Sequence, residues 1–193
     1  MNAPELRQHV PYRIGSLPLS NSFAALPPAF YTRLMPTPLP APYLVCASAS
    51  AAALINLDPA EFSAPDFVET FSGNRMQADW IPLAAVYSGH QFGVWAGQLG
   101  DGRALLIGQV RNAKGELWDI QLKGAGKTPY SRFGDGRAVM RSTIREYLAS
   151  EALAALGIPT SRALAIVATG ETVLRERPEP GAVLTRLAKS HVR

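Results

Sequence analysis

The chain has 193 residues, of which 47% are hydrophobic and 18% are charged, and its net charge is +4 at pH 7. This composition excludes a disordered or fibrous protein and predicts a packed core, and the length suits one domain better than two. No apolar run approaches the roughly 18–20 residues that a membrane span requires, and the N-terminus lacks the basic-then-apolar order of a signal peptide. We therefore expect a cytoplasmic protein without a membrane partner.

The charge is unevenly distributed along the chain. Residues 1–99 contain four Lys/Arg and six Asp/Glu, a net charge of −2, whereas residues 100–193 contain fifteen and nine, a net charge of +6. An anionic ligand is therefore expected in the second half. A nucleic-acid interface would need a denser basic stripe with interleaved aromatic residues, so no nucleic-acid partner is expected.

Cys46 is the only cysteine, so an intrachain disulfide is impossible and a cysteine-built metal site is not expected. Free cysteines are usually buried, and this one lies in the apolar run Tyr43–Ala47. We interpret Cys46 as a small buried core residue.

The first part of the chain is rich in proline. Nine of the 16 prolines lie before residue 44, and proline disfavours helix interiors and central strands. Two short helical patterns follow, at Ala47–Ile55 and at Glu61–Phe71. Residues 1–80 are therefore predicted to form an irregular Pro-rich and helical extension that packs on the domain formed by residues 81–193.

The stretch from Gly93 to Arg103, GVWAGQLGDGR, predicts a glycine-rich loop, and Ala104–Val110 predicts a short apolar strand. After a turn at NAKGE, the segment Trp118–Lys123 alternates apolar and polar residues, which is typical of a strand with one buried face. Its polar face is expected to carry Asp119, Gln121 and, at the end of the strand, Lys123.

The segment Ala138–Leu156 predicts a helix, because apolar residues recur at helical spacing and Gly157 and Pro159 are stop signals. Glu146 falls on the polar side. The apolar positions are Met140, Ile144, Tyr147, Leu148, Ala152 and Ala155.

Three further strands are predicted after this helix, at Ala163–Ala168, Thr172–Arg175 and Ala182–Leu187, with a turn at RPEPG before the last of them.

The segment Gln121–Arg137 contains a partial match to a phosphate-binding P-loop. The Gly-Lys-Thr at 126–128 fits, but Gln121 occupies the position of the first glycine, and no helical period follows. A P-loop hydrolase stays open as an alternative. It predicts that Lys127 is needed for nucleotide binding and that Lys123 is not.

The order of elements matches the small lobe of a protein kinase: glycine-rich loop, strand, strand ending in lysine, helix carrying a glutamate, further strands. In such a lobe the loop covers nucleotide phosphates, the lysine contacts them, and the glutamate holds the lysine in position. We therefore predict an α+β fold, a kinase-like small lobe built from an antiparallel sheet plus a helix, over residues 81–193.

Several motifs are specific enough to indicate a family: YSGHQFG, LGDGR, QLKGAGKTPYSRFGDGRAVMRS, REYL and LTRLAKSHVR. They resemble the selenoprotein O family, pseudokinases that act as protein adenylyltransferases, over about Tyr87–Arg193. The resemblance implies an enzyme that transfers AMP from ATP to Ser, Thr or Tyr hydroxyls of proteins. It also implies ATP with Mg²⁺ or Mn²⁺ as cofactors and proteins as substrates.

Matched motif by motif, the resemblance implies a set of site residues. Glu146 corresponds to the residue that orients the strand lysine. The residues implied to bind the nucleotide are Gly100, Gly102, Arg103, Lys123, Asp135, Gly136, Arg186 and Arg193. The family's catalytic and metal-binding carboxylates lie in the large lobe, beyond Arg193. No catalytic or metal residue is therefore expected in this chain, which we expect to be inactive alone, as a fragment or a natural truncation.

The residues alone leave other interpretations open. Gly100 and Gly102 are also typical of a hairpin, and Asp135 is also typical of a helix cap. The alternative for Glu146 is a surface ion pair with Arg141 or Arg145 of its own helix. His90 is interpreted as a structural imidazole, since no catalytic pattern accompanies it. The alternative function is an inactive nucleotide-binding or interaction module.

Overall fold

One antiparallel sheet organises the part of the chain that the computed structural model describes, residues 10–192. The strand order is β1-β3-β5-β6-β9-β8-β2, with β4 paired to β3 and β7 paired to β9. The strands are β1 (Tyr31–Arg33), β2 (Tyr43–Ala47), β3 (Leu83–Gln91), β4 (Val94–Gly100), β5 (Ala104–Arg111), β6 (Leu117–Lys123), β7 (Ala138–Val139), β8 (Arg162–Leu174) and β9 (Pro178–Ala188). The fold is thus mixed α/β with a large antiparallel sheet and few helices, which confirms the coarse fold prediction.

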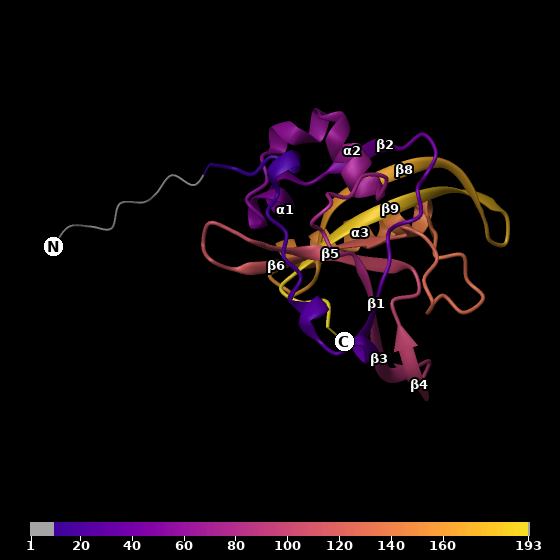
Figure 1. The fold of residues 1–193 in the computed structure, drawn as a ribbon. Helices are drawn as coiled ribbons and strands as arrows, with labels where there is room; N and C mark the ends of the chain where they lie inside the picture. The colour runs from indigo at the N-terminus through magenta and orange to yellow at the C-terminus, as the bar shows by residue number, and fades with distance from the viewer. Residues whose placement is uncertain (1–9, 193) are drawn as a thin grey trace.

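Helices lie on both faces of this sheet (Figure 1). They are α1 (Ala49–Leu54), α2 (Pro65–Ser72) and α3 (Met140–Ala155). Alternate residues of β9 divide the core: Val183 and Leu187 join the larger cluster with α1 and α2, whereas Ala182 and Leu184 join a smaller cluster against which Met140 of α3 packs. The sheet is therefore the middle of three layers, with α3 alone on one side.

Within residues 10–80, the N-terminal part of the chain forms four short helical turns, and it also supplies the two edge strands β1 and β2. The turns are η1 (Ile14–Ser16), η2 (Ser22–Ala25), η3 (Pro28–Phe30) and η4 (Pro59–Ser63). The helices predicted at Ala47–Ile55 and Glu61–Phe71 are present in shorter form, as α1 and as η4 followed by α2. Ser48 caps α1, and Gly73 ends α2 with a φ of 90°. Among residues 10–192, no helix has the length and apolarity needed to cross a membrane.

The loop predicted from Gly93 to Arg103 is wrong for most of its length, because Val94–Gly100 forms β4 and pairs with β3. Phe92 and Gly93 connect the two strands, with φ values of 55° and 78°. Such two-residue turns are usually signalled by Asn-Gly or Asp-Gly. Phe-Gly carries no such signal, so the hairpin was not predicted.

Two of the predicted strands are one. Ala163–Ala168 and Thr172–Leu174 lie in the single strand β8, with a register shift between Ala168 and Thr172, and Arg175 follows the end of this strand. The expected turn at RPEPG is also shifted, because β9 already begins at Pro178.

β6 is buried on both faces, which corrects the prediction of one solvated polar face. It is a central strand between β5 and β9, and Asp119 and Gln121 are buried. Their polar atoms are hydrogen-bonded: Asp119, for example, accepts from Gln109 Nε2 at 2.6 Å. Polar residues on a strand therefore marked a buried network here rather than a surface.

Cys46 is half-buried, not fully buried as predicted, because β2 is the last strand of the sheet. The remaining burial still raises the pKa of its thiol.

Candidate functional site

Three charged side chains from three elements meet at one end of β6. Lys123, the last residue of β6, forms an ion pair with Glu146 of α3, and Glu146 Oε1 accepts from Arg186 Nη1 of β9 at 3.0 Å. The pairing of β6 with β9 sets Gln121 opposite Arg186. Residues far apart in the sequence thus form one cluster of two cations and one carboxylate.

The environment of the cluster shifts two pKa values. Burial lowers the pKa of Lys123, and the nearby cations Arg186 and Arg103 add to this, while Glu146 opposes it. For Glu146, burial disfavours the charged form, but the bonds and charges of Lys123 and Arg186 outweigh burial and lower its pKa. The glutamate therefore stays ionised between two cations, and the cluster keeps a net positive charge that suits an anion.

Gln121 and Asp101 extend the cluster to the LGDGR motif, and sequence reasoning missed both. Gln121 Oε1 accepts from Arg186 Nη2, and Gln121 Nε2 donates to Asp101 Oδ2 at 3.3 Å. Gln121 is 1% exposed. The available signal was its spacing, since Gln121 lies two residues before Lys123 on the same side of the strand.

The glycines of LGDGR are enclosed by the loop that follows β6. A Cβ on Gly100 would lie 2.4 Å from Tyr130 Cγ, and one on Gly102 would lie 2.6 Å from the Tyr130 carbonyl oxygen. Ser131 Oγ donates to the Gly102 carbonyl at 2.5 Å. Only glycine allows this close approach. The LGDGR loop and the loop after β6 therefore pack directly against each other, and we call this side of the site the glycine-rich wall.

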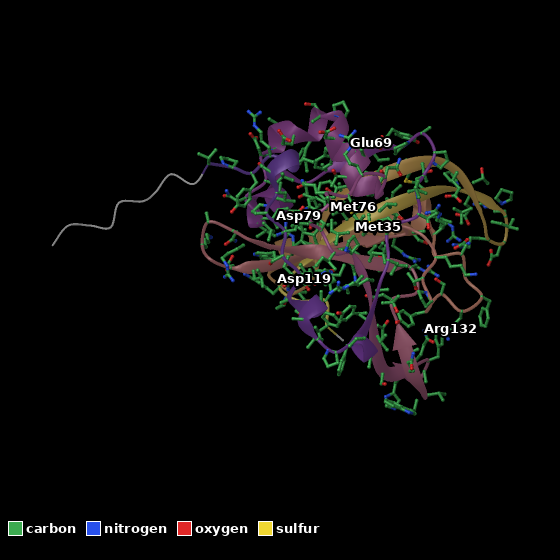
Figure 2. All side chains as sticks on the ribbon, in the orientation of Figure 1. Met35, Glu69, Met76, Asp79, Asp119 and Arg132 are labelled. Atoms are coloured by element: carbon green, nitrogen blue, oxygen red, sulfur yellow. The ribbon has the colours of Figure 1, made fainter. Side chains whose placement is uncertain are left out.

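Arg132 joins the same loop to the β3–β4 hairpin. Its Nη2 donates to Gln91 Oε1 at 3.0 Å, and Figure 2 shows its side chain beside the hairpin, far from Asp119. Within the hairpin, the His90 ring packs edge-on against Trp95, with 5.3 Å between ring centroids. The structural role of His90 stays a prediction.

A polar cavity of about 340 Å³ opens between these elements. Six of the predicted nucleotide residues line it: Gly100, Gly102, Arg103, Lys123, Gly136 and Arg186. A neighbouring cavity of about 200 Å³ shares Arg103 and Lys123 and adds Glu146. A larger apolar cavity of about 740 Å³ beside Phe23 and His191 contains none of the predicted residues.

One predicted residue, Asp135, does not join this group. The Asp135 carboxylate lies 2.6 Å from Arg175 Nη1 and is absent from the lining of these cavities. It is not the cap of α3 either, because that position is Val139. Arg193 lies outside the described residues.

The open alternatives for other residues can be compared with the geometry. Arg141 was a candidate partner of Glu146 on the same helix. Its Nε instead lies 2.6 Å from Glu179 Oε2. Lys127 is exposed, and the next helix begins only at Met140. A P-loop needs a helix directly after its lysine, so its geometry is absent here.

The fold and the site together define a class of protein. It has an antiparallel sheet flanked by a helix, a lysine–glutamate–arginine cluster beside a glycine-rich wall, and a net positive cavity suited to an anion. Within residues 10–192, no group of three or more His, Cys, Asp or Glu side chains is arranged to hold a metal ion.

Comparison with known proteins gives the family. The model of the family described as protein adenylyltransferase SelO matches residues 14–193, so the chain belongs to the SelO family. This confirms the family predicted from the motifs.

Named relatives agree with that assignment. The chain is 63% identical over 197 residues to "Protein nucleotidyltransferase YdiU" of Herminiimonas arsenicoxydans, a match that covers 100% of the chain and 39% of the relative. It is 63% identical over 181 residues to the protein of that name from Bordetella parapertussis, covering 94% and 36%. The chain thus spans less than two-fifths of the length of these relatives.

Proposed function

We propose that this chain is the nucleotide-binding small lobe of a protein adenylyltransferase, which in full length transfers AMP from ATP to Ser, Thr or Tyr hydroxyls of proteins. The observation that carries the proposal is the Lys123–Glu146–Arg186 cluster, which opens into a polar cavity beside LGDGR. The family and the printed names of the relatives support it.

The kinase-like part of the proposal rests on element order. Strands β3, β5, β6, β9 and β8 are neighbours in that order, the lysine ends the third of them, and the glutamate comes from the one helix between β6 and β8. This is the arrangement expected of a kinase small lobe. Residues 81–193 would form the lobe, and residues 1–80 would form the extension that packs on it.

Each side chain has a proposed task. Lys123 and Arg186 neutralise phosphate oxygens, and Glu146 fixes the position of both cations. The backbone at Gly100 and Gly102 lies close to the phosphates, and Arg103 contacts them from the rim. Gly136 lines the cavity and is proposed to contact the nucleotide there, whereas Asp135 and Arg193 are proposed to do so on the family resemblance alone.

The transfer also needs a divalent metal, which the family takes as Mg²⁺ or Mn²⁺. The described residues do not fit such an ion, since no cluster of ligands is present among residues 10–192. The metal ligands and the base for the incoming hydroxyl are therefore assigned to the part of the relatives outside this match. Alone, the chain is proposed to bind ATP without transferring AMP.

The test joins residues 1–193 to the remaining part of the Herminiimonas arsenicoxydans relative and measures transfer of labelled AMP to protein. Lys123→Ala should lower transfer about 100-fold, because it removes a charge aimed at the phosphates. Lys127→Ala is the matched control and should leave transfer unchanged.

Equal transfer by Lys123→Ala and wild type would reject the proposal. Loss of ATP binding in Lys127→Ala alone, measured by calorimetry, would instead favour a P-loop. If the joined protein binds ATP but transfers no AMP, the function is that of a binding module.

A further inference from the structure

Gly136, which lines the polar cavity of about 340 Å³, lies in a short loop that packs against the turn after β6. We call residues 135–137 the Gly136 loop. The φ of Gly136 is 72°, a left-handed conformation that glycine adopts at low cost. A Cβ at this position would collide with the Gly126 carbonyl oxygen, and the Gly126 amide donates to the Gly136 carbonyl oxygen at 3.3 Å. The position of this loop therefore sets the shape of one side of the cavity.

The end of β8 holds the Gly136 loop at two points, one on each side of the glycine. Arg175, directly after β8, pairs with Asp135: Nη1 lies 2.6 Å from Oδ2, and Nη2 lies 2.9 Å from Oδ1. Arg175 Nη2 also donates to the Arg137 carbonyl oxygen at 3.0 Å. On the other side of the loop, Glu171 Oε2 of β8 lies 2.8 Å from Arg137 Nε. Both residues that flank the glycine are thus bound to the same strand end.

The geometry of these contacts matters more than their charge. The Arg175 and Asp135 side chains are 27% and 43% exposed, and the charge of such a pair contributes little to stability. The pair is bidentate, however, so it fixes the orientation of the Asp135 carboxylate. Asp135 Oδ1 also accepts from the Arg137 amide at 2.9 Å, which closes the loop into a turn. Arg137 is 8% exposed and donates to the carbonyl oxygens of Thr37 and Pro38. The contacts therefore define one position of the loop.

We propose that Arg175 is a positioning residue of the nucleotide site, which acts through Asp135 to hold the Gly136 loop in the lining of the cavity. This inference rests on the proposed function, because it needs a nucleotide in that cavity. Arg175 lies outside the motifs that indicated the family. The bonds from Arg175 lower the pKa of Asp135, so the carboxylate stays ionised and paired near neutral pH.

The test uses residues 1–193 joined to the remaining part of the Herminiimonas arsenicoxydans relative, and it measures ATP affinity by calorimetry. Arg175→Ala should weaken ATP binding about 10-fold, because binding must then order a loop that the wild type holds in place. Arg175→Lys keeps the charge but not the bidentate pair, so it should lose most of this affinity as well. Arg177→Ala is the matched control. It removes an exposed arginine from the same turn between β8 and β9, and it should leave ATP affinity unchanged.

A double-mutant cycle separates positioning from direct contact with phosphate. Arg175 also lines the smaller cavity beside Lys123, so direct contact is the alternative. If Arg175 acts through Asp135, Arg175→Ala should weaken ATP binding by less than about 2-fold when Asp135→Ala is already present. An equal loss of affinity with and without Asp135→Ala would overturn the positioning role, and so would wild-type affinity in Arg175→Lys.

Hydrogen exchange of the joined protein without nucleotide gives a second measurement. The Gly126 and Arg137 amides, which donate within and to the loop, should exchange about 10-fold faster in Arg175→Ala than in the wild type. Unchanged exchange would overturn the inference. Faster exchange with wild-type ATP affinity would also overturn it, because the role of Arg175 would then be structural only. If the wild type binds ATP and Arg175→Ala binds it equally, the inference alone fails. If the wild type binds no ATP, the proposed function fails, and the inference fails with it.

Discussion

At the scale of single residues, Gln121 is the side chain that connects the cluster to the glycine-rich wall. It accepts from Arg186 and donates to Asp101, and it is buried. Gln121→Leu keeps the approximate volume but removes both bonds. A lost bond to a buried charged group costs about 1–3 kcal/mol of stability, and a misplaced Arg186 should weaken ATP binding about 10-fold.

A thermal melt and a calorimetric ATP titration of the chain measure both effects. Gln98→Leu, an exposed position on β4, is the control and should change neither. Wild-type Tm and affinity in Gln121→Leu would show that Arg186 does not depend on this bond.

At the scale of elements, the positions of regular segments could be predicted better than their orientation. The helix expected at Ala138–Leu156 is α3, within two residues at each end, because periodicity and stop signals are local. Which apolar stripe meets the sheet is a tertiary property. Met140 and Tyr147 turn inward, whereas Ile144 and Leu148, counted on the same apolar side, stay exposed.

The β3–β4 hairpin gives a prediction at the same scale. Phe92 has a φ of 55°, a left-handed conformation that is unfavourable for this residue type. Its side chain is 97% exposed, so packing does not offset this cost. Asn tolerates this conformation better, so Phe92→Asn should raise the free energy of unfolding by about 0.5–1 kcal/mol. Urea unfolding measures the change. Phe133→Asn is the control, because Phe133 is 99% exposed with a negative φ. Equal effects of both substitutions would assign the gain to lost apolar exposure instead.

At the scale of the whole molecule, the main cluster could be predicted and its network could not. The order of loop, strand, helix and strand suggested Lys123 with Glu146, and the family motifs added Arg186. The sequence did not predict the roles of Asp101 and Gln121, because these roles depend on the pairing of β6 with β9 and on burial between layers. The alternation of apolar and polar residues along the sequence predicts a strand, but it does not show whether other elements cover the polar face of that strand.

The cluster also couples the whole fold to pH, since Glu146 links α3 to β6 and β9. Its pKa is lowered from 4.5 in the native state. Below that value the unfolded chain binds more protons than the native chain, so stability falls as pH falls through the lowered native pKa. The pKa of Lys123 is also lowered, chiefly by burial. Glu146→Gln should therefore flatten part of the acid decline in the free energy of unfolding, measured by urea between pH 3 and 7. If the free energy of unfolding of Glu146→Gln falls as steeply below pH 4.5 as that of the wild type, so that the two curves are parallel, the ion pairs of Glu146 contribute no pH-dependent stability.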